Sequence, residues 1–383
     1  MTVTTPRGFT ASGIAAGIKA SGNPDLAVVH NTGPQFAAAG VFTRNRVHAA
    51  PVKWSRQSVA DGQLAAVVLN SGGANACTGP DGFADAARMA AATAGHLRVP
   101  ADDVAVCSTG LIGIRLPMDM VLDGIGTACD ALGAEGGAAA ATAIMTTDSV
   151  PKTAARQQGG WSIGGMAKGA GMLAPGLATM LVVITTDADV TAGQCDIALR
   201  EACRVSFDRA DSDGCMSTND TVLLLANGAS GVAPAVADFE DALTDLCRDL
   251  ARQLIADAEG ANHEIAIEVI GAAYEEDAEL VAREIARSNL FKCAVFGNDP
   301  NWGRVLSAIG VTDADFDPDM LDVSFNGVHV CRGGQIGEDR SLVDLTGRHV
   351  HVLVDLHAGD HTATVLTNDL TYEYVKENAE YSS

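Results

Sequence analysis

The chain has 383 residues, of which 47% are hydrophobic and only 4% aromatic, and it carries a formal net charge of −23. This length suits one large α/β domain or two closely joined domains, with aliphatic side chains filling the core. The negative charge disfavours nucleic acid and anionic membrane surfaces as partners, because both would repel the protein. No apolar run reaches the roughly 18 residues of a membrane-spanning helix, and no signal-peptide pattern is present.

The cysteines are odd in number, scattered, and never arranged as C-x-x-C. This pattern does not indicate a disulfide framework or a zinc site. We therefore expect reduced, mostly buried thiols in a cytoplasmic protein that holds no metal. The cysteines are Cys77, Cys107, Cys129, Cys195, Cys203, Cys215, Cys247, Cys293 and Cys331.

Short apolar runs bounded by turn residues predict strands at 26–29, 39–42 and 65–69. The third run opens into a Gly/Asn-rich loop at 70–79, which precedes a predicted helix at 82–97. Ligands bind at the carboxyl ends of strands in open α/β sheets. This loop lacks both the G-x-G-x-x-G pattern and the P-loop lysine, so a tight connection explains it as well as a binding loop does.

A further predicted strand, 104–108, runs into Thr109 and Gly110, and helices are predicted over 117–132 and 136–145. Small residues at a strand end leave the backbone N–H groups accessible. They are therefore candidate donors to an oxyanion. A simple strand-end turn explains the same residues.

A glycine-rich segment carrying Lys168 leads through the turn pair Pro175-Gly176 to Thr179, at the start of an apolar run. Cleavage of the bond before Thr179 would give this residue a free α-amino group, with a reference pKa of about 7.7 to 8.0. That amine could act as the base for the threonine hydroxyl. Locally, however, a turn entering a core strand is the commoner explanation.

The second half begins with a capping box at Thr191 and Gln194. The acidic loop 211–220 lacks EF-hand spacing and is interpreted as a polar, turn-rich loop. A long amphipathic helix is expected from Pro234 to about Gly260, with an apolar stripe on one side. The remaining predicted elements are a strand at 264–270, a helix at 275–289, and strands at 291–296, 321–325, 328–331, 349–355 and 362–367.

Several short motifs occur in order along the chain. They are Phe42-Thr43-x-Asn45, Asn70 to Gly79, Ser108 to Gly113, Ile144 to Asp148, Lys168 to Met172, Ala178 to Leu181, Ser217 to Asp220, Glu259 to Ala261, Asp299 to Arg304 and Asn378 to Ser383. Together they resemble the glutamate N-acetyltransferases, also called ornithine acetyltransferases, of the cyclic arginine pathway. The resemblance covers essentially the whole chain.

The resemblance implies self-cleavage between Ala178 and Thr179 into an α chain, 1–178, and a β chain, 179–383. The two would stay associated, as a dimer of such pairs. Thr179 would carry an acetyl group from N2-acetyl-L-ornithine to L-glutamate, with small molecules as the only substrates. The implied fold is a layered α/β arrangement similar to that of the self-processing aminopeptidases. No cofactor is implied, and the sequence leaves open whether acetyl-CoA is a second donor.

The same resemblance assigns oxyanion stabilisation to Thr109 and Gly110. Charge complementarity suggests that Lys168 pairs with an α-carboxylate and Glu259 with the ornithine ammonium. The substrate contacts that the resemblance implies are Thr146, Lys168, Thr179, Glu259, Asn378 and Ser383.

Two other functions remain open: an amidohydrolase of the aminopeptidase kind, and a binding protein with an inactive site. The polar tail and the Asn301 to Arg304 loop argue against the first, and the intact Thr179 and Lys168 argue against the second. The chain departs from the common family pattern at Ala170, Leu177 and Asn262-His263. The last pair affects the expected shape of the pocket near Glu259.

Overall fold

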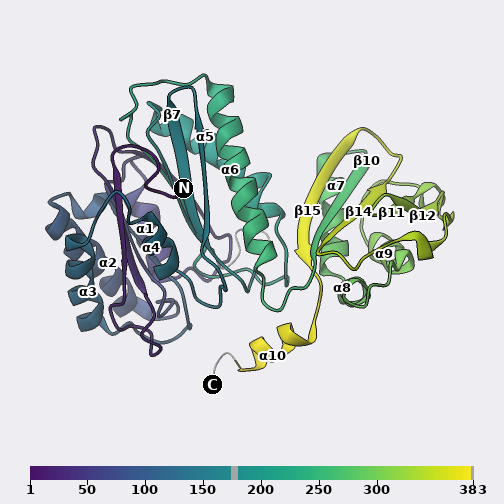
Figure 1. Ribbon diagram of the computed structural model, residues 1–383, viewed down its shortest axis with the longest axis horizontal. Coiled ribbons are helices and arrows are strands. Elements are labelled where there is room, and N and C mark those ends of the chain that lie inside the picture. Colours follow the sequence, from purple (N-terminus) through teal and green to yellow (C-terminus); the bar gives the residue numbers. More distant parts are fainter. Residues whose placement is uncertain (174–179, 381–383) are drawn as a thin grey trace. The chain divides into compact units, whose positions relative to one another are not determined.

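The computed structural model describes residues 1–173 and 180–380 (Figure 1). The predicted site residues Ala178, Thr179 and Ser383 lie outside the described residues. The chain divides into two compact units. The first comprises Met1–Met172, Gly176–Asp208 and Cys215–Leu254, and the second comprises Leu173–Pro175, Arg209–Gly214 and Ile255–Ser383.

The centre of the first unit is a five-stranded sheet in the order β3-β9-β8-β7-β6, in which β8 and β9 are parallel and the other neighbours antiparallel. Every residue of β7, β8 and β9 is buried, as expected for strands covered on both faces. The bounds are β3 Ala37–Phe42, β6 Lys152–Gln158, β7 Trp161–Lys168, β8 Leu181–Thr186 and β9 Thr221–Ala226.

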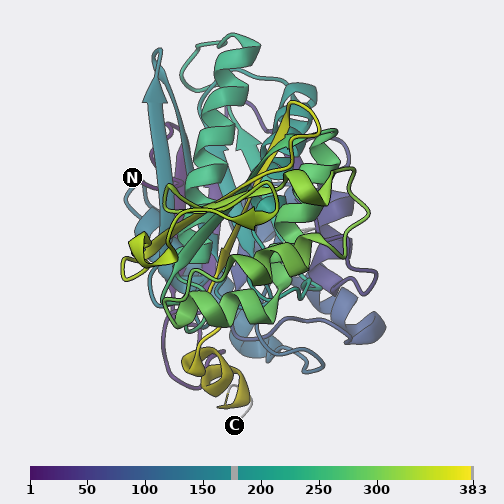
Figure 2. The ribbon, with the colours of Figure 1, turned by 90° about the vertical axis from the view of Figure 1, so that its right-hand side faces the viewer.

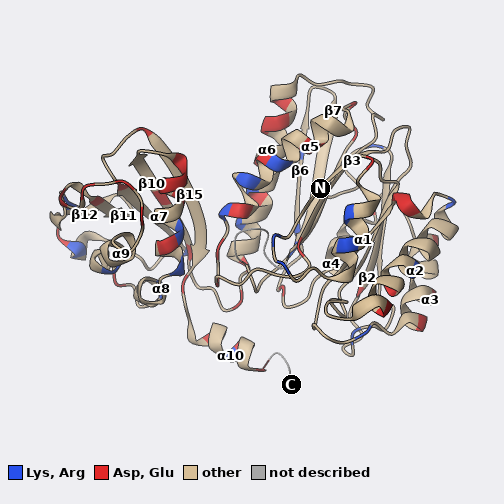
Figure 3. Ribbon diagram, turned by 180° about the vertical axis from the view of Figure 1, so that it is seen from behind, with Lys and Arg blue, Asp and Glu red and all other residues tan. Residues whose placement is uncertain are grey.

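One face of this sheet packs on the helices α5 (Ala192–Arg204) and α6 (Val236–Ala256). Alternate residues of β8 divide between the two faces: Val182 and Ile184 face these helices, and Leu181 and Val183 face the opposite layer. Figure 3 shows red and blue bands along α6, the charged side of this amphipathic helix.

The opposite layer of the first unit is a four-stranded sheet in the order β1-β2-β4-β5, with β4 and β5 parallel. Helix α4 (Gly137–Ala143) contributes to the core that this layer shares with the five-stranded sheet, and α2 and α3 pack on the outer face. The remaining bounds are β1 Phe9–Ile14, β2 Leu26–Asn31, β4 Ala66–Asn70, β5 Val104–Ser108, α1 Ala50–Ser58, α2 Gly79–Leu97 and α3 Met118–Asp130. The layered α/β fold class is therefore confirmed.

The second unit contains a six-stranded sheet in the order β13-β12-β11-β14-β10-β15, packed against helices α7 to α9 (Figure 2). The strand bounds are β10 Glu264–Ala272, β11 Asp322–Phe325, β12 Val328–Arg332, β13 Gln335–Ile336, β14 His349–Asp355 and β15 His361–Asn368. The helices are α7 Glu275–Arg287, α8 Asn289–Phe296, α9 Trp302–Ile309 and the C-terminal α10 Tyr372–Glu380.

The sequence-based assignment was wrong at 291–296, which belongs to helix α8 and not to a strand. Phe291 and Val295 are buried four residues apart, and the Ser288 hydroxyl caps the helix by accepting the Phe291 N–H. A six-residue apolar run fits the periodicity of a strand as well as that of a helix. The capping residue before the run therefore decides that it forms a helix. The capping box at Thr191 and Gln194 is confirmed.

Candidate active site

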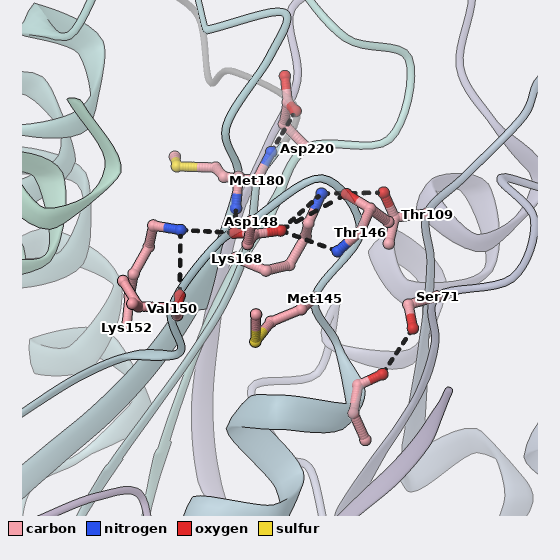
Figure 4. A network of polar contacts seen from close by, with 12 residues as sticks. Ser71, Thr109, Met145, Thr146, Asp148, Val150, Lys152, Lys168, Met180 and Asp220 are labelled. Atoms are coloured by element: carbon pink, nitrogen blue, oxygen red, sulfur yellow. Dashed lines mark hydrogen bonds and ion pairs between the residues drawn. The ribbon is translucent and has the colours of Figure 1, made fainter. Parts of the chain in front are cut away.

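The candidate site of the first unit lies where strand ends meet. Lys168, the last residue of β7, pairs with Leu181 at the start of β8, and Leu181 pairs with Thr221 at the start of β9. Thr109 directly follows β5 of the other sheet. The Lys168 Nζ lies 3.3 Å from the Thr109 Oγ1, and Figure 4 shows the two side chains pointing toward each other.

Asp148 joins two lysines in a buried network. Its Oδ1 accepts hydrogen bonds from Lys152 Nζ and from the Gly169 N–H, both at 2.6 Å. Its Oδ2 accepts the Thr146 N–H at 2.9 Å and lies 3.9 Å from Lys168 Nζ. The lysine side chains are 0% and 1% exposed, so this network is a buried charge cluster and not a surface feature.

Burial alone would raise the pKa of Asp148, but the ammonium groups of Lys168 and Lys152 oppose this effect. Hydrogen bonds from Lys152 and from the Thr146 backbone also favour the carboxylate. Together they hold the pKa of Asp148 well below its ordinary value. Asp148 is therefore a carboxylate that fixes Thr146, Gly169 and both lysines.

The Thr109-Gly110 turn is fixed by backbone contacts. The Thr109 N–H donates to the Asn70 carbonyl, and the Thr109 carbonyl accepts the Gly73 N–H, each at 3.0 Å. Gly110 has φ 134°, and a Cβ built there would lie 2.7 Å from the Gly73 nitrogen. Only glycine fits this backbone and this close approach.

These contacts alter the expectation for the oxyanion donors. Because the Thr109 N–H is already bonded, its hydroxyl is the donor that remains. The Gly110 N–H has no hydrogen-bond partner among residues 1–173 and 180–380. The Thr109 hydroxyl and the adjacent Gly110 N–H are therefore available to donate hydrogen bonds to a negatively charged oxygen.

Asp148, Lys152 and Asp220 were missed as site residues from the sequence. Asp220 accepts the Met180 N–H at 3.1 Å through its Oδ1. The two acids stand inside motifs that carry the family resemblance, Ile144 to Asp148 and Ser217 to Asp220, and that position was the only available signal.

In the second unit, the predicted contacts Glu259 and Asn378 meet. The Asn378 Nδ2, on α10, donates to the Glu259 Oε2 at 2.9 Å. The next residue, Gly260, has φ 65° and its carbonyl accepts the Thr371 hydroxyl at 2.7 Å. Glu259 is therefore held next to the C-terminal helix.

The departure at 262–263 has a defined structural role. The N–H groups of Asn262 and His263 both donate to Asp369 Oδ1 at 2.9 Å. The His263 ring nitrogens lie 2.8 Å from Asp369 Oδ2 and 2.9 Å from the Leu345 carbonyl oxygen. This pair anchors the segment after Glu259 to the residue that follows β15.

Within the described ranges, no group of three or more His, Cys, Asp or Glu side chains is arranged to hold a metal ion. In the same ranges, no helix combines the length and apolarity needed to cross a membrane. A cavity of about 810 Å³ lies away from the Thr109 and Lys168 pair, and its lining includes Phe42, Arg56 and Arg200. The chemistry described above does not depend on it.

Comparison with known proteins gives one consistent family. A sequence model of the ArgJ family matches residues 10–383. The arginine biosynthesis bifunctional protein ArgJ of Streptomyces coelicolor is 62% identical over 383 residues, with 100% of each chain covered. The protein of that name from Thermobifida fusca is 60% identical over 383 residues, with 100% of each covered. A solved ornithine acetyltransferase from Mycobacterium tuberculosis, complexed with ornithine, is 56% identical with a TM-score of 0.45, covering 47% of this chain and 96% of that chain.

Proposed function

The chain belongs to the ArgJ family, and we propose that it transfers the acetyl group of N2-acetyl-L-ornithine to L-glutamate in arginine biosynthesis, through an acetyl-Thr179 intermediate. The observation that carries this proposal is the turn at Thr109 and Gly110. It leaves a hydroxyl and an N–H without backbone acceptors, beside the buried ammonium of Lys168.

The reaction begins with a free Thr179 amine, produced by cleavage of the Ala178–Thr179 bond. This amine accepts the hydroxyl proton of Thr179 while the oxygen attacks the acetyl carbonyl of N2-acetyl-L-ornithine. The carbonyl oxygen becomes an oxyanion, which the Gly110 N–H and the Thr109 hydroxyl stabilise. The C–N bond then breaks, the proton passes from the Thr179 ammonium to the departing amine, and ornithine leaves.

In the second half-reaction the amine of glutamate attacks the acetyl-Thr179 ester. The oxyanion is stabilised by the same two donors. The ester C–O bond breaks, Thr179 recovers its proton from the attacking amine, and N-acetyl-L-glutamate leaves. Each substrate therefore reacts in turn with one nucleophile, a ping-pong scheme.

Lys168 supports this scheme through Thr109. Its ammonium can only donate, so the 3.3 Å contact is a hydrogen bond from Lys168 to the Thr109 oxygen. That bond uses a lone pair of the oxygen and leaves the hydroxyl proton for the oxyanion. The charge next to the donor also favours negative charge on the carbonyl oxygen. Pairing of Lys168 with an α-carboxylate, and of Glu259 with the ornithine ammonium, remain predictions.

The two predicted chains would stay together because they share one sheet. Strands β3, β6 and β7 precede the cleavage point, and β8 and β9 follow it. The β7–β8 pairing runs over six residue pairs. Such an arrangement supports a stable α–β pair after cleavage, and we propose that two such pairs assemble in the cytoplasm, with no metal or cofactor.

The test is a denaturing gel combined with an assay of ornithine release. Wild-type protein should give two fragments of similar size and release ornithine from N2-acetyl-L-ornithine. The Thr179→Ala variant should give one full-length band and no activity. A wild-type protein that remains a single intact band and is active would contradict the cleavage mechanism.

The effect of glutamate on ornithine release distinguishes the acetyltransferase from the alternative hydrolase. An acetyltransferase should release ornithine at full rate only when glutamate is present, whereas a hydrolase should release it equally without glutamate. Acetyl-CoA is tested as a second donor by following N-acetyl-L-glutamate formation from glutamate and acetyl-CoA alone.

A further inference from the structure

The parallel strands β8 and β9 begin side by side at the candidate site. Leu181 and Thr221 are register partners, so the residues before them, Met180 and Asp220, also lie together. The Met180 N–H donates to the Asp220 Oδ1 at 3.1 Å, as drawn in Figure 4. The exposed fractions of Met180 and Asp220 are 1% and 0%. The buried Asp220 carboxyl therefore holds the backbone amide of Met180, the residue directly before β8.

The other oxygen of this carboxyl is unusual. Asp220 Oδ2 is buried and has no hydrogen-bond partner in the part of the chain that the structure describes. The neighbouring Thr43 hydroxyl donates instead to the Ser217 carbonyl, at 2.7 Å. An ionised carboxylate in this position would leave a buried charged oxygen without a donor, which is strongly unfavourable.

Burial raises the pKa of Asp220 well above its ordinary value. The Met180 N–H and the charge of Lys168 favour the anion, but they do not outweigh burial. Burial therefore favours the protonated, neutral form of Asp220. In this form Oδ1 still accepts a hydrogen bond, so the contact with Met180 does not require a charge.

We propose that Asp220 is a positioning residue for acetyl transfer, which fixes the amino end of β8 through the amide of Met180, the residue that directly follows Thr179 in the sequence. This inference rests on the proposed function, in which Thr179 is the nucleophile. Asp220 then acts through another residue, and its role is to provide a hydrogen-bond acceptor at a fixed place. An asparagine should replace it, because the amide oxygen can accept the same N–H.

The experiment compares Asp220→Ala with Asp220→Asn, using ornithine release normalised to the cleaved fraction seen on a denaturing gel. For Asp220→Ala we expect kcat to fall at least about tenfold, with KM within about twofold of wild type, because orientation is lost and not substrate binding. For Asp220→Asn we expect kcat within about threefold of the wild-type value. A folded Asp220→Ala protein that stays uncleaved also supports the inference.

Asp187 provides a matched control at the opposite end of β8. It is also a buried acid, and it accepts the N–H groups of Ser162 and Arg7 at 2.6 and 3.0 Å. Asp187→Ala should be cleaved and keep the wild-type kcat, although it loses more hydrogen bonds than Asp220→Ala does. If Asp187→Ala loses as much kcat as Asp220→Ala, the effect is general destabilisation and the inference is overturned.

Two further outcomes would overturn it: full kcat in Asp220→Ala, or an Asp220→Asn variant as inactive as Asp220→Ala. If Asp220→Ala does not fold, Asp220→Asn decides alone. Its kcat should follow the wild-type pH profile, and loss of one limb of that profile would assign Asp220 a titrating role instead. A wild-type protein that releases no ornithine contradicts the proposed function, whereas the variant ratios in an active protein test Asp220.

Discussion

The Lys168 ammonium donates to the Thr109 hydroxyl oxygen at 3.3 Å, so a lysine that ends β7 in one sheet orients a residue that follows β5 in the other. Lys168 and Thr109 are far apart in the sequence, and the layered packing of the two sheets brings them together. The Lys168 side chain is 1% exposed, and its Nζ lies 3.9 Å from the Asp148 Oδ2. The contact therefore links the charged network to the oxyanion donors.

The first prediction concerns the Thr109 hydroxyl. Thr109→Val keeps the size and the β-branch of the side chain but removes the O–H. We expect kcat to fall about 10² to 10³-fold, the loss typical of one oxyanion donor, with little change in KM. Thr109→Ser is the control and should keep most of the wild-type kcat. Equal rates for the valine and wild-type proteins would exclude the hydroxyl as a donor.

The second prediction concerns the charge of Asp148. Asp148→Asn removes the shared carboxylate of two buried lysines, and we expect a loss of about 3 to 5 kcal/mol in the free energy of unfolding. The double variant Asp148→Asn/Lys152→Met also removes one buried ammonium and should recover part of that loss. Urea unfolding of the uncleaved Thr179→Ala chain measures both. A double variant less stable than Asp148→Asn would contradict the assignment.

The lowered pKa of Asp148 also predicts how the free energy of unfolding depends on pH at the acidic end. Its pKa is lower in the folded chain than the ordinary value of about 3.9 that it takes on unfolding. The unfolded chain therefore binds this proton first as the pH falls. The stabilisation is fully present above about pH 4 and is lost as the pH drops through the lower folded-state pKa. Asp148→Asn should flatten this acid limb of the stability curve.

Sequence patterns predicted the strands well where several β-branched residues are buried together, as in β8 and β14. They failed at α8, where a short apolar run fits both the strand periodicity and the helix periodicity. They also missed α1 and α9, since neither helix has the long apolar stripe that identifies α6.

The site was predictable only in part, for a physical reason. Lys168 and Thr109 were found through motifs that resemble a known family, but their contact required the packing of two sheets. Asp148 and Asp220 received no role, because an acid's environment depends on burial and on distant partners. The occupied Thr109 N–H was likewise invisible, since its acceptor at Asn70 lies on the neighbouring strand β4.

The third prediction is that Asp220 destabilises the protein as the pH rises. Its folded-state pKa is raised, so between about pH 4 and that pKa the folded chain holds a proton that the unfolded chain has lost. Stability from this group is present below about pH 4 and falls by up to about 1.4 kcal/mol for each pH unit above it. Asp220→Asn cannot titrate, so its advantage in unfolding free energy should grow with pH.

This prediction is measured by urea unfolding of the uncleaved Thr179→Ala chain at a series of pH values between about 5 and 9, with and without the Asp220→Asn substitution. Parallel stability curves for these two chains would show that Asp220 ionises normally in the fold.

The fourth prediction concerns the thiols. Cys77, Cys215 and Cys293 are exposed, whereas Cys107 and Cys195 are buried, and burial raises the pKa of each of these two buried thiols to about 12. Because the thiolate is the reactive form, the buried thiols should not react near pH 8. A disulfide reagent should label the three exposed cysteines of the native protein quickly and all nine cysteines in denaturant.

The three exposed thiols should be removable without loss of function, since the proposed mechanism assigns no role to any of them. Cys77→Ser, Cys215→Ser and Cys293→Ser should therefore each lower the count of fast-reacting thiols by one and keep the wild-type kcat. Mass spectrometry of the labelled protein identifies the reacted positions. Fast labelling of Cys107 or Cys195 in native protein would mean that the core around β5 or α5 opens readily, contrary to the packing described above.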